Sequence, residues 1–233
     1  MDQFSRLRLL IGDEAIEKLK TKRIAIFGLG GVGGNVADAL VRSGIEHFVL
    51  VDNDQVNITN INRQLIADIS NIGRDKVDVM EEHLKKINPN VEVIKKKIFY
   101  LPSTSQEFNF REFDYVIDAI DTVSAKIDII TKCFILKIPV ISALGCGNKL
   151  NPTMLEVTDI SKTSYDPLAR VMRRELRNRK INHLKVVYSK EPPMELIEEE
   201  KLPEEKDLPG SSAFVPPVAG IIIASEVVKD LLK

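Results

Sequence analysis

The sequence predicts an α/β protein with a Rossmann-like, doubly wound and mostly parallel sheet, continued by antiparallel strands and covered by helices on both faces. Two patterns indicate this class. Apolar runs of strand length alternate with segments of helical period through the first two thirds of the chain, as in successive βαβ units. A cluster of glycines also follows the first apolar run directly, as at the first strand-to-helix turn of nucleotide-binding sheets.

The expected elements of the parallel part follow in chain order. Apolar runs with the length of buried strands occupy residues 23–28, 47–52, 91–94, 114–120 and 138–143. Apolar residues at helical spacing fill three of the intervals, at residues 32–43, 77–87 and 124–136. Each strand is thus followed by a segment that can cross over one face of the sheet.

The pattern changes after residue 147. Residues 153–159 and 184–189 read as further strands, a basic helix is expected over 166–180, and residues 214–232 form an apolar helix that packs back on the domain. Residues 190–210 are acidic and rich in proline, which predicts an exposed loop. We expect one domain over residues 1–233, with a nucleotide-binding core at 1–150 and an appended, substrate-facing part at 151–233.

Composition excludes several classes of protein. The 33 lysines and arginines nearly balance the 34 aspartates and glutamates, so no global charge marks a nucleic-acid or membrane binder. Cys133 and Cys146 are the two cysteines, too few for a disulfide framework or for paired C-x-x-C zinc ligands. We expect Cys146 to be a buried or loop thiol and Cys133 to lie on the apolar face of a helix. No signal peptide or membrane-spanning segment is recognisable, which favours a cytoplasmic location without membrane contact.

The segment 26–35, IFGLGGVGGN, has five glycines within seven positions. Gly28, Gly30 and Gly33 fit the pattern G-x-G-x-x-G, and Asp52 ends the next apolar run 19 residues after Gly33. Positions without a Cβ let the backbone approach a phosphate, and free N–H groups at a helix start attract its charge. Asp52 is then expected to bind ribose hydroxyls. The pattern favours a nucleotide site over a plain tight turn.

The loop after the second expected strand carries more polar groups than a dehydrogenase needs. The residues concerned are Asp52, Asp54, Asn60, Asn62, Arg63 and Gln64, followed by Lys76 at the start of the next helix. Two cations beside a phosphate loop are costly to hold together unless a polyanion lies between them, which indicates a triphosphate. Any of these residues alone could be a solvated charge or a turn former, so the argument depends on their joint occurrence. An NAD-dependent dehydrogenase stays a weak alternative.

Two further carboxylates, Asp118 and Asp121, follow a later parallel strand. The carboxyl ends of parallel strands form the edge at which doubly wound sheets bind ligands. A carboxylate that faces a triphosphate indicates Mg²⁺ held by oxygen ligands. Asp118 could instead cap the following helix.

The motifs GLGGVGG, VDND, TNINRQ, GRDKV and DAIDT resemble the ATP-binding core of the ubiquitin-activating superfamily, over residues 4–150. The segments FSRLRLLIG, INPNVEV, DISKTSYDPLARVMRRELR and SSAFVPPVAG are similar to the tRNA threonylcarbamoyladenosine dehydratases, so this narrower resemblance runs nearly end to end. The chain lacks the paired C-x-x-C motifs of molybdopterin-type relatives. It has GSSAF where some dehydratases have a cysteine.

The resemblance implies an enzyme that activates a carboxylate by attack on the α-phosphate of ATP and thereby cyclises threonylcarbamoyladenosine in tRNA. It implies ATP and Mg²⁺ as cofactors, tRNA as partner and a homodimer with two ATP sites, and it leaves a sulfur-transfer protein open as a further partner. Two other functions fit the same core. One is an adenylyltransferase for the C-terminus of a ubiquitin-like sulfur-carrier protein, and the other is a non-catalytic, nucleotide-gated RNA-binding module.

The resemblance also implies a role for individual residues. Gly28, Gly30 and Gly31 would line the phosphates, and Asp52 would hold the ribose. The residues expected around the triphosphate are Asp54, Asn60, Arg63, Gln64 and Lys76. Asp121 would bind Mg²⁺, and Arg6 would enter the active site of the partner subunit, although Arg8 lies two residues away. The expected catalytic residues are Arg6, Arg63, Lys76 and Asp121.

A tRNA partner requires a basic surface. Arg170, Arg173, Arg174 and Arg177 follow i, i+3, i+4, i+7 spacing and so share one face of the expected helix. With the resemblance, we expect this stripe to bind RNA phosphates in a salt-dependent manner. The alternative is a solvated helix face that the acidic loop balances.

Overall fold

Seven strands form one mixed sheet in the order β3-β2-β1-β4-β5-β7-β6. The strands are β1 (Arg23–Phe27), β2 (His47–Val51), β3 (Glu92–Lys96), β4 (Tyr115–Asp118), β5 (Val140–Ala143), β6 (Leu155–Asp159) and β7 (Lys185–Ser189). Every neighbouring pair is parallel except β6 with β7. This computed structural model describes residues 2–197 and 209–233. The predicted doubly wound, mostly parallel sheet is confirmed.

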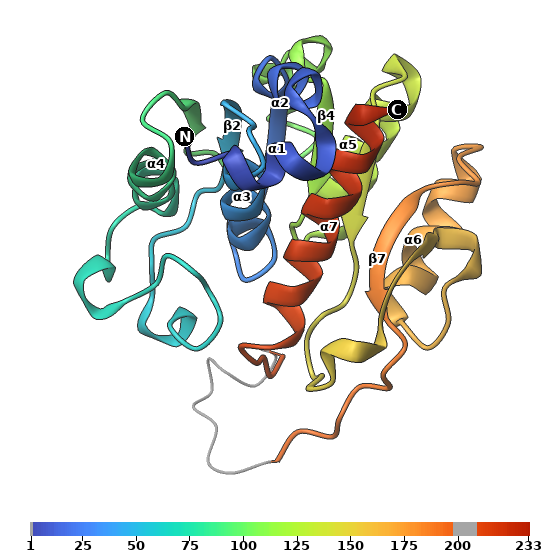
Figure 1. Cartoon of the computed structure of the whole chain (residues 1–233). Coiled ribbons are helices and arrows are strands. Elements are labelled where there is room, and N and C mark those ends of the chain that lie inside the picture. The colour runs from blue at the N-terminus through green and yellow to red at the C-terminus, as the bar shows by residue number, and fades with distance from the viewer. Residues whose placement is uncertain (1, 198–208) are drawn as a thin grey trace.

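Helices cover both faces of the sheet (Figure 1). They are α1 (Ser5–Ile11), α2 (Asp13–Lys20), α3 (Gly33–Arg42), α4 (Lys76–Ile87), α5 (Val123–Leu136), α6 (Pro167–Asn178) and α7 (Val215–Leu232). The packing of α3 against α4 and α7 forms one layer, and α5 packs against α6 on the opposite face. Two of these helices, α1 and α2, precede the first strand and were not expected from the sequence.

The two faces of the sheet follow from alternation along the strands. In β1, Ile24 and Ile26 point into the core beneath α3 and α7, while Ala25 and Phe27 point into the core beneath α5. A strand buried on both faces is apolar throughout, which is why it reads as a continuous run rather than an alternating one. The appended part of the chain shares these cores, because Val187 of β7 belongs to the same cluster as α7.

The parallel part of the sheet extends further than expected. Because β7 is parallel to β5, antiparallel pairing after residue 150 is confined to β6 and β7. The last helix, α7, crosses α3 so closely that a Cβ on Gly220 would lie 2.4 Å from the carbonyl oxygen of Val32. The C-terminal segment is therefore packed directly behind the glycine turn.

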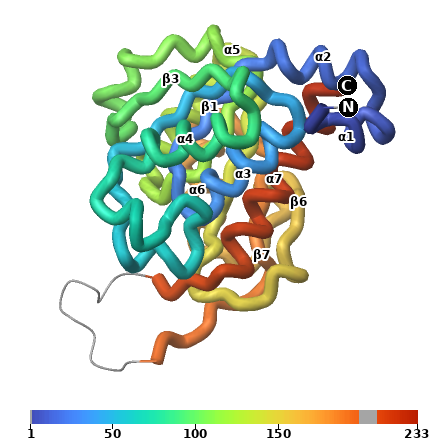
Figure 2. The backbone as a smooth tube through the Cα atoms, turned by 60° about the vertical axis from the view of Figure 1, so that its left-hand side comes forward, coloured from blue at the N-terminus to red at the C-terminus, as the bar shows by residue number. Residues whose placement is uncertain are grey.

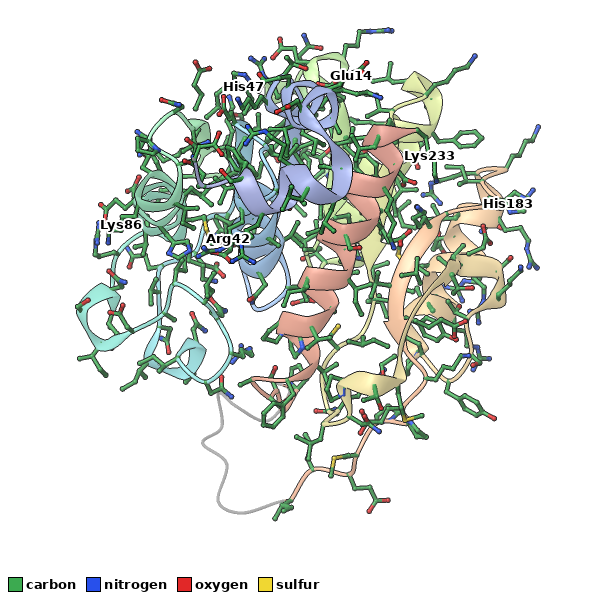
Figure 3. The ribbon with its side chains drawn as sticks, in the orientation of Figure 1. Glu14, Arg42, His47, Lys86, His183 and Lys233 are labelled. Atoms are coloured by element: carbon green, nitrogen blue, oxygen red, sulfur yellow. The ribbon has the colours of Figure 1, made fainter. Side chains whose placement is uncertain are left out.

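The strand order defines where a ligand can bind. The chain proceeds from β1 outward through β2 to β3 and then returns to the other side of β1 with β4, so the sheet reverses at the boundary of β1 and β4. In Figure 2, α7 runs beside α3, with which it is in contact. In Figure 3, Glu14, His47 and Lys233 share one end of the molecule, while α7 begins at the other, where the strands have their carboxyl ends. No helix among the described residues has the length and apolar character needed to cross a membrane.

Candidate active site

The glycine turn joins the carboxyl end of β1 to α3, beside the reversal in strand order. Gly28 has a φ of +91°, and a Cβ there would lie 2.6 Å from the carbonyl oxygen of Ala119, just after β4. A Cβ on Gly33 would lie 1.8 Å from the carbonyl oxygen of Gly28. Close backbone packing within the protein therefore accounts for these two glycines.

Packing does not account for Gly30. A Cβ at this position would meet nothing nearer than Nε2 of Gln64, at 3.9 Å. Gly31 is an intermediate case, since its Cβ would lie 3.0 Å from the Cβ of Pro216 and 3.3 Å from the carbonyl oxygen of Arg63. The bare backbone at Gly30 is thus left for a ligand to approach, as a phosphate would at the start of a helix.

Asp52 follows β2 and is fixed against the glycine turn. Its Oδ2 accepts a hydrogen bond of 2.7 Å from the N–H of Leu29, and its Oδ1 accepts one of 2.8 Å from the N–H of Asp54. Burial raises the pKa of Asp52, while the positive charge of Lys76 and the two N–H groups act in the opposite direction. Each carboxylate oxygen keeps a lone pair for a ligand hydroxyl.

Lys76 begins α4 with its ammonium group almost entirely buried. The side chain is 6% exposed, and Nζ donates to Oδ2 of Asp54 at 2.8 Å. Asp54 is anchored in turn, because its carbonyl oxygen accepts from the N–H of Lys76, yet its side chain is 58% exposed. A buried cation needs a counter-charge, but the carboxylate that supplies it here, that of Asp54, is largely solvated by water. The ammonium therefore lies where an entering polyanion can share it.

Asn60 and Arg63 lie in the loop between β2 and α4. Oδ1 of Asn60 accepts from the N–H of Asn57 at 3.1 Å, which closes a capping box around a short helix. Nη1 of Arg63 donates to the carbonyl oxygen of Thr59 and to Oδ1 of Asn62. Both side chains are engaged with their own loop, so Arg63 would exchange these neutral acceptors for a phosphate.

Gln64 is buried beside the glycine turn. Its Oε1 has no hydrogen-bond partner within the described residues. Leaving a buried polar atom unpaired costs about 1–3 kcal/mol. An amide in this state is suited to a ligand that donates a hydrogen bond.

A buried ion pair that the sequence analysis did not identify lies behind the end of β4. Asp118 and Lys126 both have side chains that are 0% exposed, with 2.9 Å between Oδ2 and Nζ. The hydroxyl of Ser142 donates to Oδ2 of Asp118 at 2.6 Å. Lys126 also donates to the carbonyl oxygens of Ile120 and Ala143. The pair thus ties the loop after β4 to the end of β5.

The sequence did contain a signal for Lys126. Lys126, Ile130 and Cys133 have i, i+4, i+7 spacing, which places a lysine within the apolar face of α5. The alternative role considered for Asp118, a cap on this helix, is wrong, because Thr122 occupies the N-cap. Oδ1 of Asp118 has no partner in the part of the chain that the structure describes.

Asp121 lies three residues beyond β4 and is exposed. No hydrogen bond or ion pair joins its side chain to residues 2–197 or 209–233. No group of three or more His, Cys, Asp or Glu side chains in those ranges could enclose a metal ion. A magnesium ion at Asp121 would thus take most of its ligands from phosphates and water, as is usual for this ion.

The loop after β5 is held by a second buried lysine that the sequence analysis missed. Nζ of Lys149 donates to the carbonyl oxygens of Gly145 and Ser189. Cys146 lies in this loop as a free thiol, and burial raises its pKa to about 12. Burial also raises the pKa of the free thiol of Cys133 in α5. Both expectations are confirmed, since Cys146 is buried and Cys133 lies on the buried face of α5.

The structure separates the two N-terminal arginines. Arg8 pairs with Asp2 at 2.9 Å and also with Asp13, so its charge is already matched. Arg6 is exposed and forms no ion pair with the described residues. α1 lies beside α2 near the amino ends of the strands, away from the glycine turn of its own subunit (Figure 1). Of the two, Arg6 is the arginine available to a second molecule.

The basic stripe on α6 is narrower than its spacing indicates. Arg170, Arg174 and Arg177 are exposed, but Arg173 is half-buried. Nη1 of Arg173 donates to the carbonyl oxygen and the hydroxyl of Thr163. Three arginines thus remain on the exposed face. The acidic loop expected at 190–210 falls for the most part on residues 198–208, outside the described residues.

Comparisons with known proteins show what this chain is similar to. A model of the ThiF family matches residues 4–233. The chain is 45% identical over 243 residues to a tRNA threonylcarbamoyladenosine dehydratase of Bacillus subtilis (strain 168), an alignment that covers 100% of this chain and 96% of the relative. It is 38% identical over 176 residues to a protein of the same name from Escherichia coli (strain K12), which covers 76% of this chain and 66% of the relative.

A solved structure is similar over almost the whole chain. It is the E. coli tRNA N6-threonylcarbamoyladenosine dehydratase in complex with ATP, with a TM-score of 0.89 and 32% sequence identity. The match covers 99% of this chain and 93% of that one.

Proposed function

The chain belongs to the ThiF family, and we propose that it catalyses the ATP-dependent dehydration of threonylcarbamoyladenosine in tRNA. The observation that carries this function within the molecule is the buried ammonium of Lys76 at the same sheet edge as the bare backbone of Gly30. A dinucleotide fold built for hydride transfer has no use for a buried cation at this position. A triphosphate supplies negative charge that can pair with the ammonium of Lys76.

The site residues divide into three roles toward ATP. Asp52 accepts from the ribose hydroxyls, and the backbone at Gly28, Gly30 and Gly31 faces the phosphates. The side chains that surround the triphosphate are Asp54, Asn60, Arg63, Gln64 and Lys76. The open position at Gly30 fits a phosphate, and the orphaned Oε1 of Gln64 fits a hydroxyl or amino donor of the nucleotide.

Asp121 is the residue that we propose for Mg²⁺. Asp121 is exposed, whereas Asp118 is fully buried and forms an ion pair with Lys126. The ion would supply positive charge to the triphosphate. Lys126 positions the loop that carries Asp121 by donating to the carbonyl oxygen of Ile120.

The reaction proceeds in two substitutions. A carboxylate oxygen of the modified nucleoside attacks the α-phosphorus, the bond to the bridging oxygen breaks, and pyrophosphate leaves. A nitrogen or oxygen of the same nucleoside then attacks the activated carbonyl carbon and loses its proton, and AMP leaves. The net change in the nucleoside is the loss of one water. Lys76 and Arg63 stabilise the charge that builds on the phosphate oxygens.

The second step needs no enzyme nucleophile. Attack within one nucleoside has an entropic advantage of roughly 7–11 kcal/mol in favourable geometry. The buried thiol of Cys146 has a pKa raised to about 12, so it is protonated at neutral pH and unsuited to attack.

The test is incubation of the purified protein with ATP, Mg²⁺ and tRNA that carries threonylcarbamoyladenosine, without any sulfur-transfer protein. Nucleoside mass spectrometry is expected to detect a product lighter by one water, with one AMP released per product. Pyrophosphate exchange that requires a ubiquitin-like carrier and ignores tRNA would instead favour the adenylation of a carrier protein. Retention of tRNA without AMP formation would favour a non-catalytic RNA-binding module.

We also propose a homodimer in which Arg6 completes the site of the partner subunit. On α1, Leu9 is 84% exposed and Leu10 is 82% exposed, next to an arginine without an ion pair among the described residues. Adjacent exposed leucines of this size indicate a surface that a second copy covers.

Mixed dimers test this arrangement. Arg6→Ala and Lys76→Met proteins are each expected to be nearly inactive. Mixing them in equal amounts is expected to recover about a quarter of the unmodified activity, because half of the dimers are mixed and each has one complete site. Failure to recover activity on mixing, with subunit exchange verified, would place Arg6 outside the partner's site.

For the tRNA we propose that Arg170, Arg174 and Arg177 bind phosphates, with Arg173 fixing the start of the helix through Thr163. The residues after 150 thus form the RNA-facing part of a single adenylating domain. A tRNA substrate also supports the proposal of a cytoplasmic location.

A further inference from the structure

Tyr165 is the most exposed aromatic residue in the described part of the chain, at 76%. It precedes α6, between the short helix Ile160–Lys162 and the proline that begins α6. Because so little of the residue is buried, packing within the protein gives no reason for an aromatic ring at this position.

The backbone of Tyr165 is also unusual. Its φ is +58°, a region that side chains other than glycine and asparagine adopt at a cost. The other non-glycine residues with positive φ in the described ranges have ordinary reasons. Lys137 and Lys180 terminate α5 and α6, where a left-handed residue is common, and Asn148 is an asparagine. Tyr165 ends no α-helix, so its conformation is imposed by the loop.

Asp166, the residue after Tyr165, fixes this loop to the edge of the candidate active site. Oδ2 of Asp166 accepts from the N–H of Gly145 at 3.1 Å, two residues beyond the end of β5. Oδ1 of Asp166 accepts from the N–H of Ala169 and thereby caps α6. Asp166 itself is buried. The backbone next to Tyr165 is therefore anchored at the sheet edge where the proposed nucleotide site lies.

Tyr165 also lies at one end of the basic stripe. The exposed arginines 170, 174 and 177 continue from it along α6, a helix of 12 residues and hence about 18 Å long. A strand of RNA that follows these charges toward the sheet edge passes the tyrosine before it reaches the site. Figure 1 shows α6 on the flank of the molecule, beside β7.

We propose that Tyr165 is a stacking platform for an unpaired base of the tRNA substrate, adjacent to the nucleoside that enters the active site. The inference rests on the proposed function. Proteins recognise single-stranded RNA loops by stacking bases on exposed aromatic rings and by holding the backbone with arginines. The ring is 76% exposed, so a base can cover it, and strained backbone of this kind is often found at ligand-binding positions. The stacking is independent of base identity, because every base has a π-face.

Three variants of one position test the platform. Tyr165→Asn removes the ring and suits the left-handed backbone, so the protein is expected to melt no lower than the unmodified protein. Its affinity for tRNA carrying threonylcarbamoyladenosine is expected to fall by about 5- to 150-fold, the range for the loss of one stacked base. Tyr165→Phe is expected to bind within about twofold of the unmodified protein, because it keeps the ring.

Salt dependence separates stacking from charge. Stacking releases no counterions, so Tyr165→Asn is expected to weaken binding equally at all salt concentrations. Arg174→Ala serves as the matched control, since loss of a phosphate contact lowers the slope of log affinity against log salt by about one. Phe134→Ala, which removes a ring that is 55% exposed on α5, is expected to leave binding unchanged.

A fluorescent reporter gives a direct readout. The chain has no tryptophan, so Tyr165→Trp introduces a single one, and tRNA is expected to quench its emission while ATP alone does not. Undiminished tRNA binding by Tyr165→Asn, or a tryptophan that tRNA leaves unquenched, overturns the platform while the proposed function stands. Failure of the unmodified protein to bind tRNA overturns both.

Discussion

Replacement of Lys76 by methionine is expected to abolish most of the adenylation activity while leaving the fold intact. Methionine keeps most of the buried aliphatic stem and removes the ammonium, whose Nζ lies 2.8 Å from Oδ2 of Asp54. The substitution therefore separates the charge of Lys76 from its packing. Lys76→Ala would remove both at once and would not distinguish them.

The magnitudes follow from exposure. Asp54 is 58% exposed, so water solvates its carboxylate once the ammonium is gone, and the lost ion pair is worth about 0–1 kcal/mol of folding free energy. In the proposed transition state the same ammonium would face the charge that builds on the phosphates. Loss of one such preorganised contact costs about 3–4 kcal/mol, or about 10²- to 10³-fold in rate. The loss of activity is thus expected to exceed the loss of stability several times over.

The assay compares AMP formation with urea-induced unfolding for the same preparation. Lys97→Met is a matched control, because Lys97 also pairs with an aspartate at 2.5 Å, Asp75, which precedes α4. Lys97 is 52% exposed and is not among the residues proposed to surround the triphosphate, so the variant is expected to retain activity within about twofold. If Lys76→Met turned over ATP within a few-fold of the unmodified protein, Lys76 would not face the triphosphate and the assignment would be wrong.

Three further predictions concern other parts of the molecule. Lys126→Met leaves the carboxylate of Asp118 buried without a counter-charge, so the free energy of unfolding in urea is expected to fall by about 3–5 kcal/mol. The double variant with Asp118→Asn is expected to recover part of this loss. Unchanged stability of the single variant would contradict the prediction. Burial raises the pKa of Cys146 from 9.0 to about 12, which keeps the thiol protonated until the pH approaches 12. At pH 8 the native protein is therefore expected to be alkylated about a thousandfold more slowly than an exposed thiol. Rapid labelling, measured by mass spectrometry, would refute the burial of this thiol. Arg177→Ala is expected to lower the salt slope of tRNA binding by about one, whereas Arg173→Ala is expected to change it less, because Arg173 already donates to Thr163.

The fold was predictable because its strands are buried on both faces. Runs such as 23–28 and 47–52 are continuous in apolar residues, and the glycine turn marks the first crossover. The direction of β7 was not predictable, since its pattern is the same whether its neighbour is parallel or antiparallel. That α7 fits against α3 at Gly220 is a tertiary contact that no local periodicity encodes. The short helices α1 and α2 gave too few turns of periodicity for identification.

The site was predictable where a motif and a strand end coincide. Asp52 lies at the turn because its strand ends there, and its contact with Leu29 follows from the neighbouring positions of β1 and β2. The burial of Lys126 was harder to predict, because a lysine in a helix is most often a solvated charge. Arg173 illustrates the opposite failure. Its spacing matches the exposed stripe, but the hydroxyl of Thr163, brought beside it by the preceding loop, captures its guanidinium.

The ion pair of Asp118 and Lys126 is better explained by its positioning of neighbouring segments than by a gain in folding stability. A buried ion pair gains little net free energy over apolar residues of the same volume, because both charges lose their hydration. Lys126, however, donates to groups from three segments: the carboxylate at the end of β4, the carbonyl oxygen of Ile120 in the following loop, and that of Ala143 at the end of β5. An apolar side chain could fill the same space without fixing these segments relative to one another. Asp121 is the next residue after Ile120, so the buried pair sets the place of an exposed carboxylate that has no other anchor among the described residues.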